Sequence, residues 1–69
     1  MPSSVIKEAY YRLDEAALEI LFTTGRRYLY RDVPPEEAGR FAAAASKGRY
    51  FNARIRDRYD FTEVVSLPT

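Results

Sequence analysis

One turn sequence, Thr23-Thr24-Gly25, constrains the fold of this chain more than any other feature. Large apolar residues alternate with their neighbours over residues 18–22 before the turn, and Tyr28-Leu29-Tyr30 follows it. Alternation with a period of two is typical of strands, and a glycine-ending turn between two such runs is typical of a β-hairpin. The sequence therefore predicts an antiparallel hairpin over residues 18–30.

The length of the hairpin turn decides which way the two tyrosines point. A three-residue loop with Gly25 in the left-handed conformation places Ile20 opposite Tyr28 and Leu18 opposite Tyr30. A two-residue turn shifts the register by one and sends both tyrosines to the other face. We expect the longer loop, because it gathers all five large side chains of the hairpin on one surface.

A helix is expected to begin at Val33-Pro34-Pro35-Glu36-Glu37. Proline is tolerated in the first turn, and acidic side chains there favour the positive end of the helix dipole. Asp32 is expected to cap this helix or to lie next to the cap. Ala38, Phe41 and Ala42 recur at helical spacing, so this face is expected to press onto the sheet with Phe41 as its main anchor.

Ser46 is expected to cap a second helix that runs from about residue 47 to residue 58. Its residues Phe51, Ile55 and Tyr59 recur at every fourth position and form a narrow apolar stripe. Beyond it, residues 60–69 contain one short β-like run, which predicts either an edge strand or a frayed C-terminal tail. No internal repeat or linker is present.

These elements, with a first strand over residues 4–11, predict an α+β domain: a three-stranded antiparallel β-meander followed by two α-helices packed on one sheet face. Residues 1–69 are expected to form a single domain whose body spans residues 3–59. The expected core consists of Leu18, Ile20, Phe22, Tyr28, Tyr30, Val33, Phe41, Phe51, Ile55 and Tyr59.

The 69 residues include no cysteine and no histidine. Disulfides and thiolate metal sites are therefore excluded, and the usual general base near neutral pH is missing. The serines have no histidine to activate them, and a chain this short can hardly enclose a catalytic cleft. We expect no enzymatic activity, no cofactor and no metal. No apolar run approaches the roughly 20 residues that span a membrane, so a soluble cytoplasmic protein is expected.

Basic residues concentrate in the C-terminal half, although the net charge is only +1. Basic side chains meet phosphates, and exposed aromatic rings stack on unpaired bases. On a helical wheel the basic residues border the apolar stripe of the second helix from both sides and form no single stripe. The residues expected to bind RNA, tRNA or another polyanion are Arg27, Lys47, Arg49, Tyr50, Asn52, Arg54, Arg56 and Arg58.

A second use of the surface stays open. In the preferred register, Leu21 and Leu29 lie on the sheet face opposite the tyrosines. Two exposed leucines would form an apolar patch that a small domain covers by pairing with a copy of itself or with a larger protein. The alternative prediction is therefore a protein-interaction or homodimerisation module centred on Leu21 and Leu29.

Five short motifs follow one another along the chain. They are Ser3-Ser4-x-Ile6, Leu18-Glu19-Ile20-x-Phe22-x-x-Gly25, Tyr28-x-Tyr30, Val33-Pro34, and Ser46-x-Gly48-x-Tyr50-Phe51-Asn52 with Ile55 and Tyr59. This ordered set resembles the KTSC domain, a module found as a free-standing bacterial protein and at the C-terminus of some lysyl-tRNA synthetases. The resemblance implies a small α+β module, with RNA binding suggested by the synthetase context, and it does not imply an enzyme.

Overall fold

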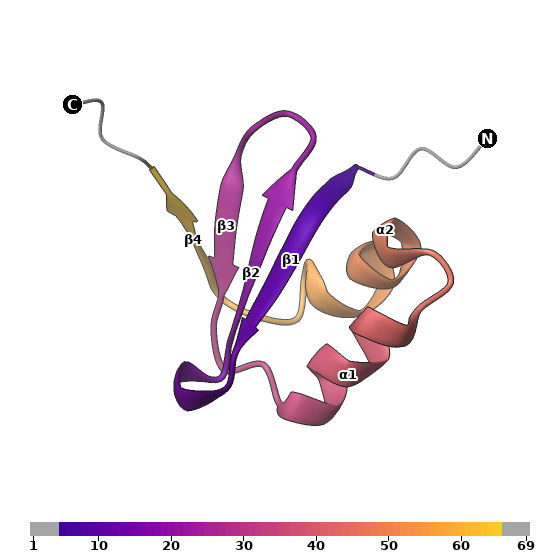
Figure 1. Cartoon of the computed structure of the whole chain (residues 1–69). Coiled ribbons are helices and arrows are strands. Elements are labelled where there is room, and N and C mark those ends of the chain that lie inside the picture. The colour runs from indigo at the N-terminus through magenta and orange to yellow at the C-terminus, as the bar shows by residue number, and fades with distance from the viewer. Residues whose placement is uncertain (1–4, 66–69) are drawn as a thin grey trace.

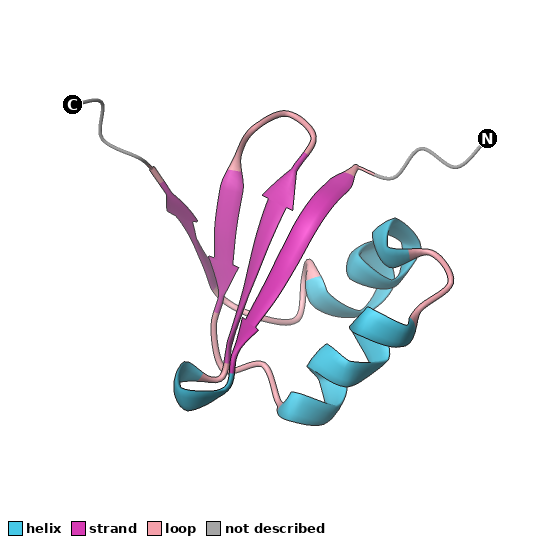
Figure 2. Cartoon of the chain, viewed as in Figure 1, coloured by secondary structure: helices cyan, strands magenta, loops and turns pink. Residues whose placement is uncertain are grey.

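The computed structural model describes residues 5–65 and contains a four-stranded antiparallel sheet with the order β1-β2-β3-β4 (Figure 1). The strands are β1 (Ile6–Arg12), β2 (Ala17–Phe22), β3 (Arg27–Tyr30) and β4 (Phe61–Val64), and a short 3-10 turn, η1 (Leu13–Glu15), joins β1 to β2. The helical segments are α1 (Pro35–Ala43), α2 (Lys47–Tyr50) and η2 (Phe51–Ile55). They lie on one face of the sheet (Figure 2), so the predicted α+β class is confirmed.

The hairpin between β2 and β3 has the predicted register. Leu18 pairs with Tyr30 and Ile20 pairs with Tyr28. Gly25 has a φ of 91°, and its N–H donates to the carbonyl of Phe22 at 2.9 Å. This left-handed position favours glycine because a side chain would be strained there. The three-residue turn therefore places both tyrosines on the same face as the apolar residues of β2.

The predicted count of three strands is wrong, because β4 adds a fourth strand beside β3. Phe61 pairs with Tyr30 and Val64 pairs with Arg27, and the N–H of Arg31 donates to the carbonyl of Asp60 at 2.8 Å. The ring of Phe61 packs on that of Tyr30, with 5.2 Å between their centroids. Strand pairing and the ring contact together hold residues 61–64 in the sheet. Of the two predicted alternatives for this run, an edge strand or a frayed tail, the structure has the edge strand. Residues 66–69 of that tail lie outside the described residues.

Helix α1 begins later than the predicted cap. Its N-cap is Pro34, and no side-chain hydrogen bond caps the helix at this end. Asp32 lies two residues further back with a φ of 58°, and it turns the chain between β3 and α1. The predicted capping role of Asp32 is therefore wrong. The physical reason lies in the two consecutive prolines. Pro34 is extended, as a residue before proline usually is, and Pro35 suits the first helical position, so α1 begins at Pro35.

The second helix starts at its predicted cap but is not a regular α-helix. The N–H of Arg49 donates to the Ser46 hydroxyl oxygen at 3.4 Å. After four α-helical residues, η2 widens into a π-helix, in which the N–H of Arg56 donates to the carbonyl of Phe51 at 2.9 Å. The expected continuous helix over residues 47–58 is wrong in this respect. The widening still leaves Phe51 and Ile55 both buried against the sheet.

The core lies between the sheet and the helical segments. Of the predicted core residues, seven are buried: Leu18, Ile20, Tyr30, Val33, Phe41, Phe51 and Ile55. Phe22, Tyr28 and Tyr59 are half-buried and pack against this cluster. Ala38 joins the core from the helix face that was expected to press onto the sheet, and Ile6 joins it without having been predicted. Within residues 5–65, no helix covers the other sheet face (Figure 1).

Glu19 is buried on that uncovered face and is held by two arginines. Its carboxylate accepts hydrogen bonds from Arg12 at 2.8 Å and from Arg27 at 2.5 Å, while 7% of its side chain is exposed. The bond from Arg12 and then the bond from Arg27 lower the pKa of Glu19 below its ordinary value of 4.5. The ion pairs therefore take the place of solvent for a buried charge.

This cluster predicts a change of stability with pH. Because the pKa of Glu19 is lowered in the folded state, its contribution is present above the ordinary pKa and is lost as the pH falls through the folded-state pKa. We expect the difference in free energy of unfolding between the wild type and Glu19→Gln to shrink as the pH falls below about 5 and through the lowered pKa of Glu19. Urea titrations at several pH values measure it, and a difference that stays constant would contradict the assignment.

Candidate functional site

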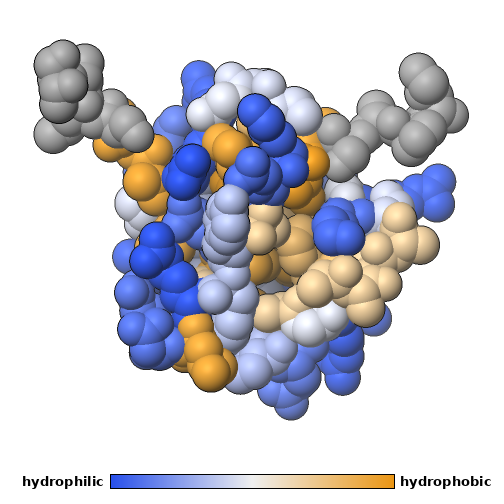
Figure 3. All heavy atoms as spheres, viewed as in Figure 1, coloured by the Kyte–Doolittle hydropathy of each residue, from blue (hydrophilic) through white to orange (hydrophobic). Residues whose placement is uncertain are grey.

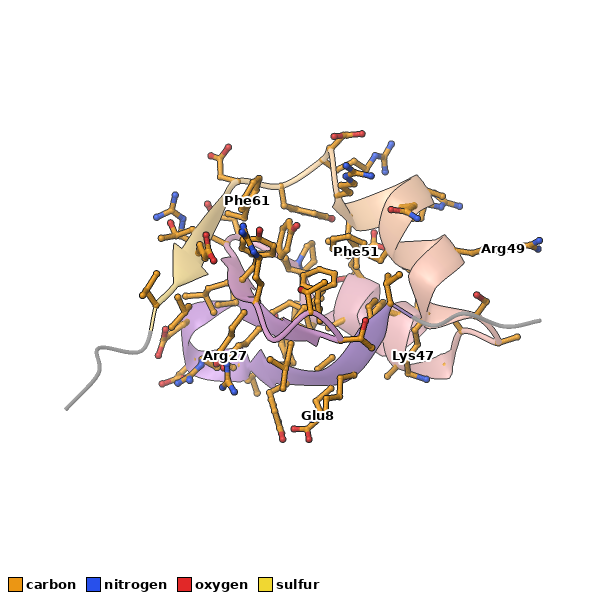
Figure 4. The ribbon with its side chains drawn as sticks, turned by 90° about the horizontal axis from the view of Figure 1, so that it is seen from above. Glu8, Arg27, Lys47, Arg49, Phe51 and Phe61 are labelled. Atoms are coloured by element: carbon orange, nitrogen blue, oxygen red, sulfur yellow. The ribbon has the colours of Figure 1, made fainter. Side chains whose placement is uncertain are left out.

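A groove lies between strands β2 to β4 of the sheet and the helical segment η2. Its volume is 610 Å³, and strands β2, β3 and β4 face η2 across it. Phe61 on β4 and Phe51 on η2 lie on its two sides (Figure 4). The residues that line it are Val5, Phe22, Thr23, Thr24, Arg26, Tyr28, Tyr30, Phe51, Asn52, Arg56, Asp57 and Phe61.

Two local features of the chain form this groove. The three-residue turn before Arg26 sets the register that places Tyr28 and Tyr30 on the groove side of β3. On the opposite side, the π-helical turns of η2 carry Asn52 and lead into Arg56. Such π-bulges are uncommon and occur frequently at functional sites. The π-helical segment η2 therefore lies in the wall of the groove, where such irregular helices often accompany function.

Five of the twelve residues that line the groove carry aromatic rings, and most of the contacts between these rings are edge to face. Tyr28 makes T-shaped contacts with Phe22 at 5.3 Å and with Phe61 at 5.4 Å between ring centroids. Tyr30 makes a similar contact with Phe51 at 5.3 Å. These contacts hold the rings in fixed orientations. Phe61 is 51% exposed, so it offers a preorganised aromatic surface to a ligand.

Tyr30, which carries a hydroxyl group, is one of the residues that line the groove. Its ring is buried, and burial raises the pKa of Tyr30 above its ordinary value. Among the described residues, no side chain or backbone group forms a hydrogen bond with this hydroxyl. The group is therefore available as a donor or an acceptor to whatever enters the groove.

The charged rim of the groove is positive. It consists of Arg26 beside the turn, Arg56 after η2, and a single carboxylate, Asp57. The neighbouring Tyr28 hydroxyl and the charge of Glu63 raise the pKa of Arg26. Two guanidinium groups beside the exposed Phe61 ring form a surface suited to a phosphate chain that carries planar groups.

The structure separates the residues that the sequence predicted to bind a polyanion. Asn52 and Arg56 line the aromatic groove. Arg49 points away from the molecule, and Arg27 lies on the uncovered sheet face, where it pairs with Glu19 (Figure 4). Lys47 lines a different hollow. Arg54 and Arg58 are exposed and line neither of these two hollows.

Tyr50 has an additional structural contact. Its hydroxyl donates to the buried Glu37 of α1, and that hydrogen bond raises the pKa of Tyr50. The Tyr59 hydroxyl donates to the same carboxylate at 3.5 Å, and burial is the main cause of the raised pKa of Tyr59. Glu37 thus ties α1 to both ends of the second helical segment. The Tyr50 hydroxyl is already engaged within the protein.

The alternative surface is less apolar than predicted. Leu21 and Leu29 do lie opposite the tyrosines, but both are half-buried. Leu29 pairs with the buried Glu19, and Leu21 pairs with Arg27, so charged side chains surround them. The expectation of two exposed leucines is therefore wrong, because both side chains are partly covered on a sheet face that also carries Glu19 and Arg27.

Of the twelve residues that line the groove, sequence reasoning assigned a binding role only to Asn52 and Arg56, and it missed Phe61 and Arg26 among the others. Phe61 lies in the run that was left open between an edge strand and a frayed tail, and Arg26 was not among the residues expected to bind a polyanion. Phe61 and Glu63 lie on the same face of the strand, so the short final run shows no alternation that would mark an inward-facing ring. Nothing local in the sequence indicated that this ring lies beside Tyr28.

Two further properties concern the described residues as a group. Within residues 5–65, no three acidic side chains come together in a way that could hold a metal ion. None of the helices in the same part of the chain is long and apolar enough to cross a membrane.

Comparisons with known proteins agree on one similarity. A family model described as the KTSC domain matches residues 2–59. A protein from Tsukamurella paurometabola is 42% identical over 57 residues, covering 83% of this chain and 85% of that protein. A lysine–tRNA ligase from Nostoc punctiforme is 36% identical over 61 residues, which are 88% of this chain but 11% of the ligase. The crystal structure of a KTSC domain protein from Yersinia pestis has a TM-score of 0.87 at 32% identity, covering 94% of this chain and 92% of that one.

Proposed function

Because this chain belongs to the KTSC domain family, we propose that it is a non-catalytic module that binds unpaired RNA in its aromatic groove. The observation that carries the proposal is the exposed Phe61 ring, held between Tyr28 and Tyr30 and bordered by Arg26 and Arg56. Proteins that bind single strands combine aromatic stacking platforms with a positive groove along the backbone. An RNA partner implies a cytoplasmic location.

The chemistry of the groove suits a nucleic-acid strand in three ways. A base can stack on Phe61, and stacking contributes about 1–3 kcal/mol per base. Arg56 and Arg26 can receive phosphate oxygens in the bidentate manner of a guanidinium group. Asn52 and the Tyr30 hydroxyl can form hydrogen bonds with base edges, which unpaired RNA exposes.

The match to a lysine–tRNA ligase adds a biological context to this proposal. That match covers 11% of the ligase, so the ligase's own activity is not transferred to this chain. An RNA-handling enzyme that carries such a segment favours an RNA ligand over other polyanions. A tRNA offers unpaired loops, which are the parts of RNA that proteins read with stacking side chains.

The groove also favours binding over catalysis. Its ionisable groups are two arginines, one aspartate and two tyrosines. It contains no pairing of a nucleophile with a general base of the kind that acyl or phosphoryl transfer requires. Its volume of 610 Å³ lies in the range of ordinary ligand sites.

Two matched arginine variants test the proposal. We expect Arg56→Gln to weaken binding of a fluorescent oligouridylate and to lower the slope of log affinity against log salt by about one. Arg49→Gln removes an equal charge from the same helical region, but Arg49 points away from the groove (Figure 4), so the slope is expected to stay near that of the wild type.

Fluorescence anisotropy between about 50 and 200 mM salt measures both slopes. Equal losses for the two variants would indicate diffuse attraction to the whole basic surface and would contradict the groove. No binding of oligouridylate or tRNA at low salt would end the RNA proposal.

A further inference from the structure

Asp57 is the one carboxylate among the described residues that line the aromatic groove. It lies just after η2, next to Arg56, and is exposed. No other described residue forms a hydrogen bond or an ion pair with its carboxylate. A free carboxylate repels the phosphates of a nucleic-acid strand, so it lowers the affinity for every strand unless it binds another part of the ligand.

The opposite sheet face carries a carboxylate that is fully paired within the protein. Figure 3 shows that face, on which hydrophilic residues cover much of the strands. Glu19 is buried there and accepts hydrogen bonds from Arg12 at 2.8 Å and from Arg27 at 2.5 Å. Asp57 has an arginine as its chain neighbour, and yet the two side chains form no ion pair. Both carboxylate oxygens of Asp57 are therefore available to a ligand.

Asp57 lies close enough to the buried Tyr30 ring to act on its hydroxyl. Burial is the main cause of the raised pKa of Tyr30, the charge of Asp57 adds to it, and the charge of Arg56 opposes it. The Tyr30 ring also packs on the exposed ring of Phe61, with 5.2 Å between the centroids and 31° between the planes. A carboxylate, a hydroxyl and a stacking ring therefore line the same groove.

The Watson–Crick edges of the four RNA bases differ in what they offer to a carboxylate. Guanine has two adjacent donors, N1–H and the N2 amino group, and a carboxylate can accept from both at once. Adenine and cytosine have a ring nitrogen acceptor beside their amino group, and uracil has one N–H between two carbonyl oxygens. In these three bases an acceptor comes to lie against a carboxylate oxygen and is repelled by it.

We propose, on the premise that the groove binds unpaired RNA, that Asp57 selects guanine. The base stacks on Phe61, its N1–H and N2 amino group donate to the Asp57 carboxylate, and its O6 accepts from the Tyr30 hydroxyl. These bonds offset the repulsion between Asp57 and the phosphates. A strand without guanine meets that repulsion alone, so the same residue attracts one base and disfavours the other three.

Three fluorescent pentaribonucleotides test this proposal, each with two uridines on either side of a central guanosine, inosine or adenosine. We expect the guanosine strand to bind the wild type about tenfold more tightly than the adenosine strand, as one bidentate pair discriminates. Inosine lacks the N2 amino group and keeps N1–H, so its strand is expected to bind with intermediate affinity. Fluorescence anisotropy at about 50 mM salt measures all three affinities.

Two variants, Asp57→Asn and Asp60→Asn, remove the same charge at nearby positions. An asparagine amide accepts one hydrogen bond and donates another, which matches adenine and not guanine. Asp57→Asn is therefore expected to abolish the preference for guanosine and to raise the affinity for the adenosine strand. Asp60 is exposed and does not line the groove, so Asp60→Asn is expected to keep the preference of the wild type.

Equal wild-type affinity for the guanosine and adenosine strands would overturn guanine selection. So would a preference that survives in Asp57→Asn, or one that Asp60→Asn loses to the same degree. In each of these results the strands still bind, so the RNA groove itself stands. If none of the three strands bound at low salt, the RNA groove and guanine selection would both be contradicted.

Discussion

Ile55→Ala is expected to destabilise the domain by about 2–5 kcal/mol, because it leaves a cavity in the core. Ile55 has no exposed surface, and it is the residue through which the π-helical turns of η2 reach the sheet. Small domains have total stabilities near the lower end of about 5–15 kcal/mol, so the variant is expected to be largely unfolded at moderate urea concentrations. Circular dichroism during urea titration measures the change.

Arg58→Ala is the matched control for this prediction. Arg58 follows η2 and is exposed, so its loss is expected to change the free energy of unfolding by less than about 0.5 kcal/mol. If Ile55→Ala cost no more than this control, η2 would not be packed against the sheet as described, and the groove that it borders would have no fixed wall.

Phe61→Ala is expected to weaken binding of single-stranded RNA by about 1–3 kcal/mol, which is the contribution of one stacked base. Phe61 is 51% exposed and borders the groove from the edge strand β4. Because its ring also packs on Tyr28 and Tyr30, the alanine variant loses some stability as well. Anisotropy titration with oligouridylate, beside a urea titration of the same sample, measures both effects.

Two further variants keep this prediction decisive. Phe61→Leu preserves apolar packing without an aromatic face and is expected to bind RNA nearly as weakly as the alanine variant. Leu13→Ala removes another exposed apolar side chain, from η1, and is expected to leave RNA binding unchanged. Full binding by Phe61→Leu would show that the ring is not a stacking surface.

The sequence was sufficient to predict the part of the fold that local chemistry controls. Gly25 determines a three-residue turn, the turn determines the register, and the register places Tyr28 and Tyr30 beside Ile20 and Leu18. Ser46 likewise indicated the start of the second helix, and its hydroxyl accepts the expected hydrogen bond. In each case residues close together in the sequence carry the whole signal.

The remainder depends on contacts between distant parts of the chain. β4 forms because Phe61 meets Tyr30 and because Arg31 donates to Asp60, and no pattern within residues 60–65 expresses either contact. The change from α- to π-helix at Phe51 has no marker in the sequence either. The groove is built from these two features. Composition and spacing could therefore place basic residues on the second helix, but they could not show that Asn52 and Arg56 are the ones that line the groove.

The most direct test of the central claim is a map of where RNA meets the protein. Titration of the isotope-labelled domain with oligouridylate at low salt, followed by NMR, is expected to shift the backbone amides of Arg26, Tyr28, Asn52 and Phe61. Shifts confined to Arg27 and Leu29 on the uncovered sheet face, or no shifts at all, would contradict the assignment of RNA to the aromatic groove.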